Sequence, residues 1–372
     1  MSKIVVGMSG GVDSAVTAHL LKEQGHEVIG VFMRNWDSLT NNDILGNPNA
    51  QATICPEEED WNDVVTLGKQ IGIEVMRVDF VKEYWDDVFQ DLIKKYEKGW
   101  TPNPDILCNK YVKFGAFHNW VFKNIENVDY IATGHYADVE DGVLKKPHDH
   151  WKDQTYFLAQ VSKEGLRKAM FPLAKLPKKQ VREIATKNNL IVANKKDSTG
   201  ICFIGERDFA KFLQNYIPSQ PGDIVDIKTN KVVGKHVGAM YYTIGQRKGL
   251  NLGGMTEPHY VAGHDIKNKK IFVAPQSDKS YLMSNNSKIQ EMNWLIDDKL
   301  EGKELQVKFR YKSEALNCKI KWIDKETLHV EYPKGFEAVT LGQQAVFYDG
   351  DYCVGGGVIS EIFFDNKKLD YV

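Results

Sequence analysis

A glycine- and serine-rich turn near the N-terminus constrains this chain more than any other feature. It follows the apolar run Ile4-Val5-Val6 and leads into a segment that places Val12, Val16 and Leu20 on one helical face. The order is therefore strand, turn, helix. The turn consists of Gly7, Met8, Ser9, Gly10, Gly11, Val12, Asp13 and Ser14. Adjacent glycines let a backbone turn tightly and approach a ligand, and the N–H groups at a helix start bind anions. The turn predicts a binding site for a phosphate chain.

The order of glycines and serines in this turn narrows the class of phosphate-binding loop that it can represent. It has neither the G-x-x-x-x-G-K-[ST] pattern of a P-loop nor the G-x-G-x-x-G pattern of a dinucleotide-binding fold. The string SGGVDS at residues 9–14 instead resembles the pyrophosphate-binding loop of the ATP pyrophosphatases. That resemblance implies cleavage of ATP between its α- and β-phosphates and adenylation of a substrate oxygen. An ordinary glycine-serine turn is the alternative interpretation.

Length and composition bound the remaining possibilities. A chain of 372 residues predicts two or three domains, and 42% hydrophobic with 26% charged residues is typical of a soluble globular protein. The net charge of −2 means that a nucleic-acid partner would have to meet local basic patches. Apolar runs are too short for a membrane span, and a strand that begins by Ile4 leaves no room for a targeting peptide. We expect a cytoplasmic protein with no membrane partner.

Strands and helices alternate in the first half of the chain, which predicts an α/β fold with a parallel sheet covered on both faces. The expected strands are residues 4–6, 28–33, 74–78 and 130–133, and the expected helices are residues 15–23, 57–71 and 85–96. Ligands of open α/β sheets bind beyond the carboxyl ends of the strands. The turn at residues 7–14, Met33 and Gly134-His135 should therefore surround one crevice.

The character of the chain changes after residue 205. A helix is expected at residues 208–216 and a pair of β-rich arms at 224–233. Short alternating runs follow at residues 305–311, 318–322, 327–332 and 345–348, and turn residues separate them as in a small β-barrel. The strings YYTIGQRKG (241–249) and KFRYK (308–312) join aromatic and basic residues, which suits RNA contact. A solvated hairpin and the wet face of a strand explain them equally well.

The cysteines carry the second chemical signal. Cys55, Cys108, Cys202, Cys318 and Cys353 form no C-x-x-C pair, and the chain has no zinc-binding pattern, so we predict no protein metal site. Cys108 follows a proline-rich loop, and if Asp105 caps the next helix, the thiol lies in the first turn, where the helix dipole favours the thiolate. An ordinary cap and an ordinary packing residue fit the same pattern. Cys202 has a similar setting after Gly200, and Cys55, Cys318 and Cys353 are expected to be structural.

Six stretches together resemble the bacterial tRNA-specific 2-thiouridylases, in the family's order and over nearly the whole chain. They are residues 7–14, 101–110, 132–137, 152–154, 197–205 and 242–250. The resemblance implies an N-terminal adenine nucleotide alpha hydrolase-like (PP-loop) domain at 1–204. It implies a small α+β central domain that contacts tRNA at 205–280 and a C-terminal β-barrel at 281–372.

The resemblance also implies a reaction. ATP, with Mg²⁺ bridging its phosphates and Asp13 contributing, adenylates the C2 oxygen of the wobble uridine in tRNAs for lysine, glutamate and glutamine. Cys202 carries a persulfide received from a cysteine desulfurase or a sulfur-relay protein, and its sulfur attacks C2. Cys108 then attacks the persulfide to form a Cys108–Cys202 disulfide, and Asp105 acts as acid/base or holds the target base.

Further site residues follow from the same resemblance. Met33 and Gly134 join residues 7–14 in the ATP site. The implied tRNA contacts are Asn103, Pro104, Asp105, His135, Lys152, Asp153, Gln154, Arg310, Tyr311 and Gln343. Two alternatives keep the loop but not the cysteines: an ATP-dependent amidoligase that uses ammonia, and a nucleotide sensor that never turns ATP over.

Overall fold

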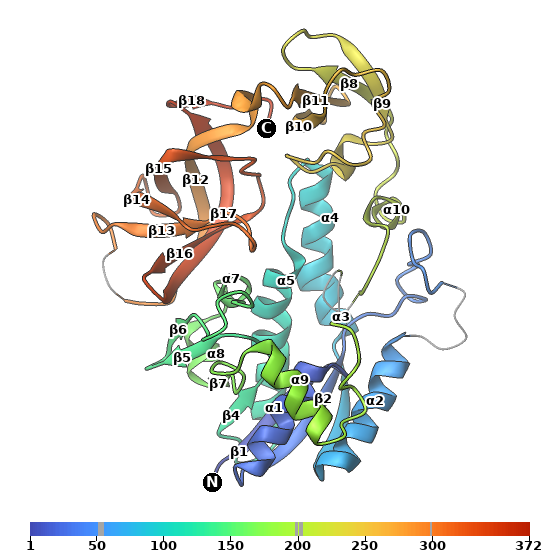
Figure 1. Ribbon diagram of the computed structural model, residues 1–372, viewed down its shortest axis with the longest axis vertical. Helices are drawn as coiled ribbons and strands as arrows, with labels where there is room; N and C mark the ends of the chain where they lie inside the picture. The colour runs from blue at the N-terminus through green and yellow to red at the C-terminus, as the bar shows by residue number, and fades with distance from the viewer. Residues whose placement is uncertain (51–55, 198–199, 201–203, 298–299) are drawn as a thin grey trace. The chain divides into compact units, whose positions relative to one another are not determined.

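The computed structural model describes residues 1–50, 56–197, 200, 204–297 and 300–372 (Figure 1). The chain forms two compact units. The first comprises Met1–Phe89, Pro104–Arg207 and Asp351–Val354, and the second comprises Gln90–Asn103, Asp208–Gly350 and Gly355–Val372. No helix in the described part of the chain is long and apolar enough to cross a membrane.

The first unit is built on a parallel sheet with the strand order β3-β2-β1-β4-β7. Its strands are β1 (Lys3–Met8), β2 (Glu27–Arg34), β3 (Glu74–Asp79), β4 (Tyr130–Ala132) and β7 (Ala169–Met170). After Lys3 the central strand β1 has no charged residue because both of its faces are buried, and Ile4, Val5 and Val6 have no exposed surface. The predicted parallel sheet is confirmed, and β7 is an addition that the sequence did not indicate.

Helices cover both faces of this sheet, as predicted. On one face Ile4, Val6 and Met8 pack in one core with Val64 and Val181. These two residues belong to the helices labelled α2 and α9 in Figure 1. Side chains alternate along a strand, so Gly7 lies on the opposite face, where Phe117 of α6 approaches it. The helices and the short hairpin of this unit are α1 (Val12–Glu23), α2 (Pro56–Ile71), α3 (Val81–Tyr84), α5 (Pro104–Leu107), α6 (Phe117–Asn124), α7 (Thr155–Leu158), α8 (Lys163–Arg167), α9 (Lys178–Lys187), β5 (Asp138–Glu140) and β6 (Val143–Lys145).

Two long helical segments contain π-helical stretches. One joins α3 through Trp85–Phe89 to α4 (Gln90–Glu97), and the other joins α5 through Cys108–Ala116 to α6. The predicted amphipathic segment at 85–96 is confirmed, since Val88, Phe89, Leu92 and Tyr96 are buried.

The second unit contains a small sheet and a barrel. The small sheet has the order β10-β11-β8-β9, with β8 (Gly222–Asp226), β9 (Val232–His236), β10 (His259–Asp265) and β11 (Lys270–Pro275). Asp208 caps the preceding helix α10 (Phe209–Gln214) by accepting from the Lys211 N–H. The stretch at residues 241–249 is not a hairpin, because it continues from a 3₁₀ turn at Ala239–Tyr241 into an irregular loop.

The barrel strands follow the order β12-β15-β14-β13-β16-β17, and pairing of β12 with β17 closes the ring. Their bounds are β12 (Met283–Trp294), β13 (Leu305–Lys308), β14 (Leu316–Trp322), β15 (Leu328–Glu337), β16 (Gln344–Asp349) and β17 (Tyr352–Phe364), with β18 (Lys367–Lys368) paired to β17. Alternating residues fill the interior, among them Val307, Phe309, Tyr332 and Phe347, which are at most 1% exposed. The predicted C-terminal β-barrel is confirmed.

Candidate functional site: a phosphate loop with its ion-pair network

The glycine-rich turn joins β1 to α1 as predicted. Gly10 has a φ of +70°, and a Cβ placed there would lie 2.8 Å from the carbonyl oxygen of Asp60, so only glycine fits without strain. Gly11 is the N-cap residue of α1 and has no side chain to occupy the N–H groups of the first turn. Ser14 Oγ lies 3.2 Å from Ser9 Oγ and accepts from the Ser9 N–H at 3.1 Å. The turn is a cradle lined by backbone N–H groups and hydroxyls, which suits a phosphate chain.

The three predicted strand ends meet at this turn. A Cβ added to Gly7 would lie 3.2 Å from the Met33 Cε at the end of β2. A Cβ added to Gly134, just beyond β4, would lie 2.8 Å from the Ser14 N atom. The structure therefore brings Met33 and Gly134 together with residues 7–14, and a larger residue than glycine at 134 would displace the loop.

Asp13 is held by two groups from distant parts of the chain. Lys178 Nζ at the start of α9 donates to both carboxylate oxygens, at 2.7 and 2.8 Å, and the Tyr136 hydroxyl donates at 3.0 Å. Burial, together with the negative charge of Asp13, raises the pKa of Tyr136, so that its hydroxyl stays a donor. The loop carboxylate is thus neutralised and oriented.

Lys178 also connects the loop to a second carboxylate. Its Nζ lies 2.9 Å from Asp197 Oδ1, and Asp197 additionally pairs with Arg182 at 2.6 Å and Lys152 at 3.2 Å. Burial opposes the charged form of Asp197, but hydrogen bonds and charges from Lys178 and Lys152 hold its pKa at about 2. Lys178, Arg182 and Lys152 therefore form one ion-pair network beside the turn with Asp13 and Asp197.

Four of the sequence-predicted tRNA contacts lie next to this network. Gln154 Oε1 accepts from the Tyr136 N–H at 2.9 Å, and Asp153 Oδ1 accepts from the Thr155 N–H at 3.0 Å and from its hydroxyl at 2.6 Å. His135 Nδ1 lies 2.8 Å from Thr133 Oγ1. Desolvation and then the charge of Lys113 hold the pKa of His135 well below its usual range, so this imidazole is neutral at physiological pH. His135 precedes Tyr136 in the chain, and the segment Lys152–Gln154 is joined to Tyr136 through Gln154, so both are connected to the loop through the hydrogen bond from Tyr136 to Asp13.

The structure corrects the expected setting of Cys108. The helix begins at Pro104, whose fixed φ suits a first helical position, so Asp105 lies inside the first turn rather than capping it. Cys108 follows that turn at the start of the π-helical stretch and is completely buried. Cys202, its expected partner, and Cys55 lie outside the described residues. Cys318 and Cys353 are buried, as expected of structural residues.

Three further predicted contacts, Arg310, Tyr311 and Gln343, belong to the second unit. Arg310 Nη2 donates to the carbonyl oxygens of Ile244 and Ala338 at 2.9 and 3.0 Å and to Thr340 Oγ1 at 3.1 Å. Gln343 Nε2 donates to the Thr101 carbonyl oxygen at 2.9 Å. Tyr311 is half-buried, with Lys312 Nζ 4.6 Å from its ring centroid. These hydrogen bonds give Arg310 and Gln343 a structural role. Contact with tRNA stays a prediction for Arg310, Tyr311 and Gln343.

Comparison with known proteins now decides the family. Residues 2–206 match a family model described as a tRNA methyl transferase HUP domain, 210–275 a tRNA methyl transferase PRC-barrel domain, and 284–359 an aminomethyltransferase beta-barrel domain. The chain is 56% identical over 371 residues to a tRNA-specific 2-thiouridylase MnmA from Mycoplasmopsis pulmonis, covering all of both chains. It is 58% identical over 365 residues to the protein of that name from Mycoplasma mobile, covering 98% of each. The chain belongs to the tRNA-specific 2-thiouridylase family.

Sequence reasoning missed the residues that hold Asp13. Lys178 lies 165 positions from Asp13, so no local pattern joins them. One signal was available: α9 begins with Lys178 and Lys179, although positive charge at a helix N-terminus is unfavourable unless something else requires it. In this structure Asp13 and Asp197 supply that requirement for Lys178.

Proposed function

We propose that the chain is a tRNA-uridine 2-sulfurtransferase, which replaces the C2 oxygen of a uridine in tRNA with sulfur. The observation that carries the proposal is the similarity to proteins named as tRNA-specific 2-thiouridylases along the full length of the chain. The domain assignment that goes with it is a PP-loop catalytic domain at 1–204, a tRNA-contacting domain at 205–280 and a barrel at 281–372.

The phosphate loop supports ATP as the source of activation. Its backbone cradle, closed by glycines at 10 and 134 where a Cβ would clash, fits a phosphate chain. Lys178 lies within 2.8 Å of both Asp13 oxygens, and by exchanging one of its carboxylate partners it would pair with a pyrophosphate leaving group as negative charge develops there. Adenylation would turn the C2 oxygen into part of AMP, a far better leaving group than oxide.

A magnesium ion fits this site through few protein ligands. Mg²⁺ bound to nucleotides takes one or two carboxylates, and the phosphates and water complete its shell. Asp13 is the loop carboxylate in position for that role, and the ion would neutralise phosphate charge. The described residues contain no cluster of three or more ligands that would hold a metal without the nucleotide.

Sulfur transfer is assigned to the two cysteines. A persulfide on Cys202, received from a cysteine desulfurase or a relay protein, would supply the terminal sulfur that attacks C2 and expels AMP. Cys108 would attack the Cys202 sulfur, so that the sulfur–sulfur bond of the persulfide breaks and a Cys108–Cys202 disulfide forms. An external dithiol would restore both thiols. Complete burial of Cys108 implies that its surroundings must open when the substrate binds.

The RNA contacts remain with the residues predicted from the sequence. Asn103, Pro104 and Asp105 would hold the target uridine, and His135, Lys152, Asp153 and Gln154 would contact tRNA beside the phosphate loop. Arg310, Tyr311 and Gln343 complete the set. The expected acceptors are the tRNAs for lysine, glutamate and glutamine.

The test is a thiolation assay with the purified chain, ATP, magnesium, cysteine, a cysteine desulfurase and each of these three tRNAs. Thiolated tRNA migrates slowly in a mercury-containing gel, whereas methylated tRNA does not, so the readout separates sulfur transfer from the methyl transfer in the family-model descriptions. We expect an ATP-dependent shift that Cys108→Ser and Cys202→Ser abolish.

Cys318→Ser and Cys353→Ser are the matched controls, because both residues are buried and neither is assigned a role in sulfur transfer. The two controls should keep the shift. Pyrophosphate release without any shift would instead support another ligase of the PP-loop class and reject the proposal.

A further inference from the structure

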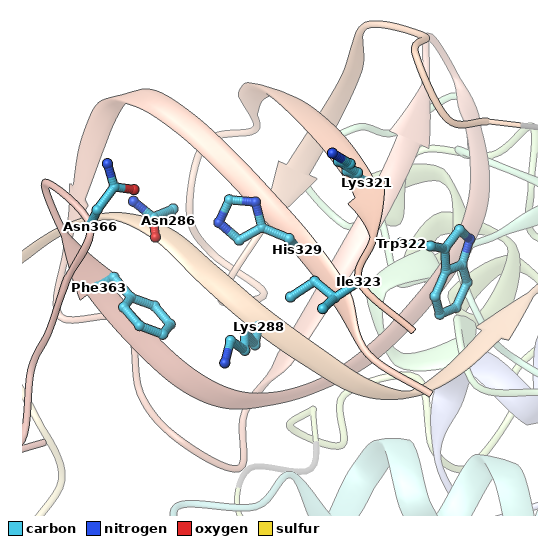
Figure 2. A pocket seen from close by; sticks show the side chains of 8 residues that line it. All are labelled: Asn286, Lys288, Lys321, Trp322, Ile323, His329, Phe363 and Asn366. Carbon is cyan, nitrogen blue, oxygen red and sulfur yellow. The ribbon is translucent and has the colours of Figure 1, made fainter. Parts of the chain in front are cut away.

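The outer face of the barrel carries a hollow with a volume of about 470 Å³, and none of its lining residues is assigned a role above (Figure 2). Residues of three kinds line it: the amides Asn286 and Asn366, the basic residues Lys288, Lys321 and His329, and the apolar residues Trp322, Ile323 and Phe363. None of the lining residues is acidic. A volume of this size lies in the range of small-ligand sites.

Strand register gathers the basic residues. Lys321 of β14 pairs directly with His329 of β15, and His329 pairs directly with Lys288 of β12. Their neighbours Ile320, Val330 and Ile289 point inward and are at most 4% exposed, so these three side chains form a row on the outer face.

The row places two lysines, Lys288 and Lys321, on either side of His329 on neighbouring strands, which gathers positive charge on this face. Lys288 has Glu361 at 3.1 Å, and His329 has Glu331 at 3.7 Å. Lys321 is exposed and has no carboxylate within 4 Å among the residues described here. The row therefore favours an anionic ligand near Lys321.

Two rigid turns border the hollow. In the turn after Ile323, Asp324 accepts from the Glu326 and Thr327 N–H groups, each at 2.8 Å. The turn that carries Asn366 is tied to β12, since the Asp365 N–H donates to Asn285 Oδ1 at 3.0 Å and Asn285 Nδ2 returns a bond to Asp365 at 2.7 Å. The shape of the hollow is thus present before any ligand binds.

The chemistry of the two ends differs, and the difference points to one ligand class. Figure 2 shows Phe363, Asn286 and Asn366 gathered at one end, His329 in the middle beside Asn286, and Lys321 and Trp322 toward the other end. An aromatic ring beside amide groups is how proteins bind unpaired bases, and lysines bind phosphates. We infer that this hollow binds an unpaired nucleotide of the RNA substrate, with the base against Phe363 and its phosphate at Lys321. The inference rests on the proposed function, which makes RNA the substrate.

The test measures tRNA affinity of the full chain as a function of salt, with two substitutions of opposite character. Lys321→Glu removes a phosphate contact, so affinity should fall about tenfold and the slope of affinity against salt should decrease by about one. Phe363→Leu keeps an apolar side chain but loses the aromatic face, so affinity should fall about tenfold with no change of slope.

Lys319→Glu is the matched control, an exposed residue of the same strand that does not line the hollow. Apart from the general effect of its charge on the salt dependence, this substitution should change tRNA affinity less than twofold. A short unstructured RNA should compete with tRNA for the hollow of the native protein, and Phe363→Leu should abolish binding of this RNA. Inorganic phosphate at the same concentration should not compete with tRNA.

The outcomes separate this inference from the proposed function. If the native chain thiolates tRNA but both variants bind tRNA as the native chain does, the hollow has no role in RNA binding and the inference is wrong. A variant that binds tRNA normally but needs more of the sulfur donor would identify a protein contact instead, which also rejects it. If the native chain does not thiolate tRNA but its RNA binding still depends on Phe363, only the proposed function is rejected.

Discussion

The phosphate loop of the first unit and the hollow of the barrel would bind anions by different means. In the loop, consecutive residues supply backbone N–H groups and two hydroxyls. The positive φ of Gly10 and the close approach of the loop to Gly134 shape the cradle. In the hollow, single side chains come from β12, β14, β15 and β17, and the pairing register places them side by side. A site made of backbone tolerates no added side chain, whereas a site made of separate side chains loses one contact at a time.

The first prediction tests the backbone-built site and has the largest expected effect. Gly10→Ala places a Cβ 2.8 Å from the Asp60 carbonyl oxygen at a φ of +70°, so the loop must move. Pyrophosphate release in the presence of tRNA should fall about a hundredfold or more, since strain and lost contacts together amount to roughly 3 kcal/mol. The control Gly72→Ala has a similar φ of +74° with nothing within 4 Å, and should cost stability of about 1 kcal/mol without loss of activity.

The second prediction concerns the lysine that holds the loop. Lys178→Met leaves Asp13 and Asp197 without a shared cation, and it should lower pyrophosphate release by about thirtyfold, as expected for one lost transition-state contact of roughly 2 kcal/mol. Lys179→Met changes the adjacent lysine, whose side chain is 90% exposed and 3.9 Å from Glu183. If both variants release pyrophosphate at the native rate, Lys178 has only a structural role.

The third prediction distinguishes two roles for Arg310 in the second unit. Because its Nη2 donates to three acceptors, Arg310→Met should lower the free energy of unfolding by about 2–3 kcal/mol in urea titrations. A purely RNA-binding arginine would instead leave unfolding unchanged and weaken only tRNA binding. Lys312→Met, two residues further, is the control. It should change neither the free energy of unfolding nor the midpoint of the urea titration from which that energy is obtained.

The smallest expected effect is a pH dependence. The pKa of Asp197 is lowered from 3.8 to about 2, so its contribution to stability is complete above pH 4 and is lost as the pH falls toward 2. Asp197→Asn should flatten the dependence of the unfolding free energy on pH in that window only. An unchanged slope would mean that the pairing with Lys178, Arg182 and Lys152 adds nothing to stability.

Local patterns made much of the first unit predictable. The loop at residues 9–14 could be found because its function depends on neighbouring backbone atoms, and Met33 and Gly134 followed because strands of a parallel sheet end at one edge. The helix before Cys108 starts two residues earlier than a cap at Asp105 predicts, at Pro104 instead of Ile106. Asp105 is a good cap in isolation, but proline is favoured at the first helical position, and Pro104 precedes it.

By itself, the sequence determined the features of this protein that depend on residues close together in the chain. These features are the strand–turn–helix of the phosphate loop, the alternation that leads to a parallel sheet, and the period-two runs of the barrel. Only the tertiary structure decided that Lys178 neutralises Asp13, that Cys108 is buried, and that Lys321, His329 and Lys288 form a row. These relations join residues many positions apart, and they depend on packing and strand register, which no local spacing encodes.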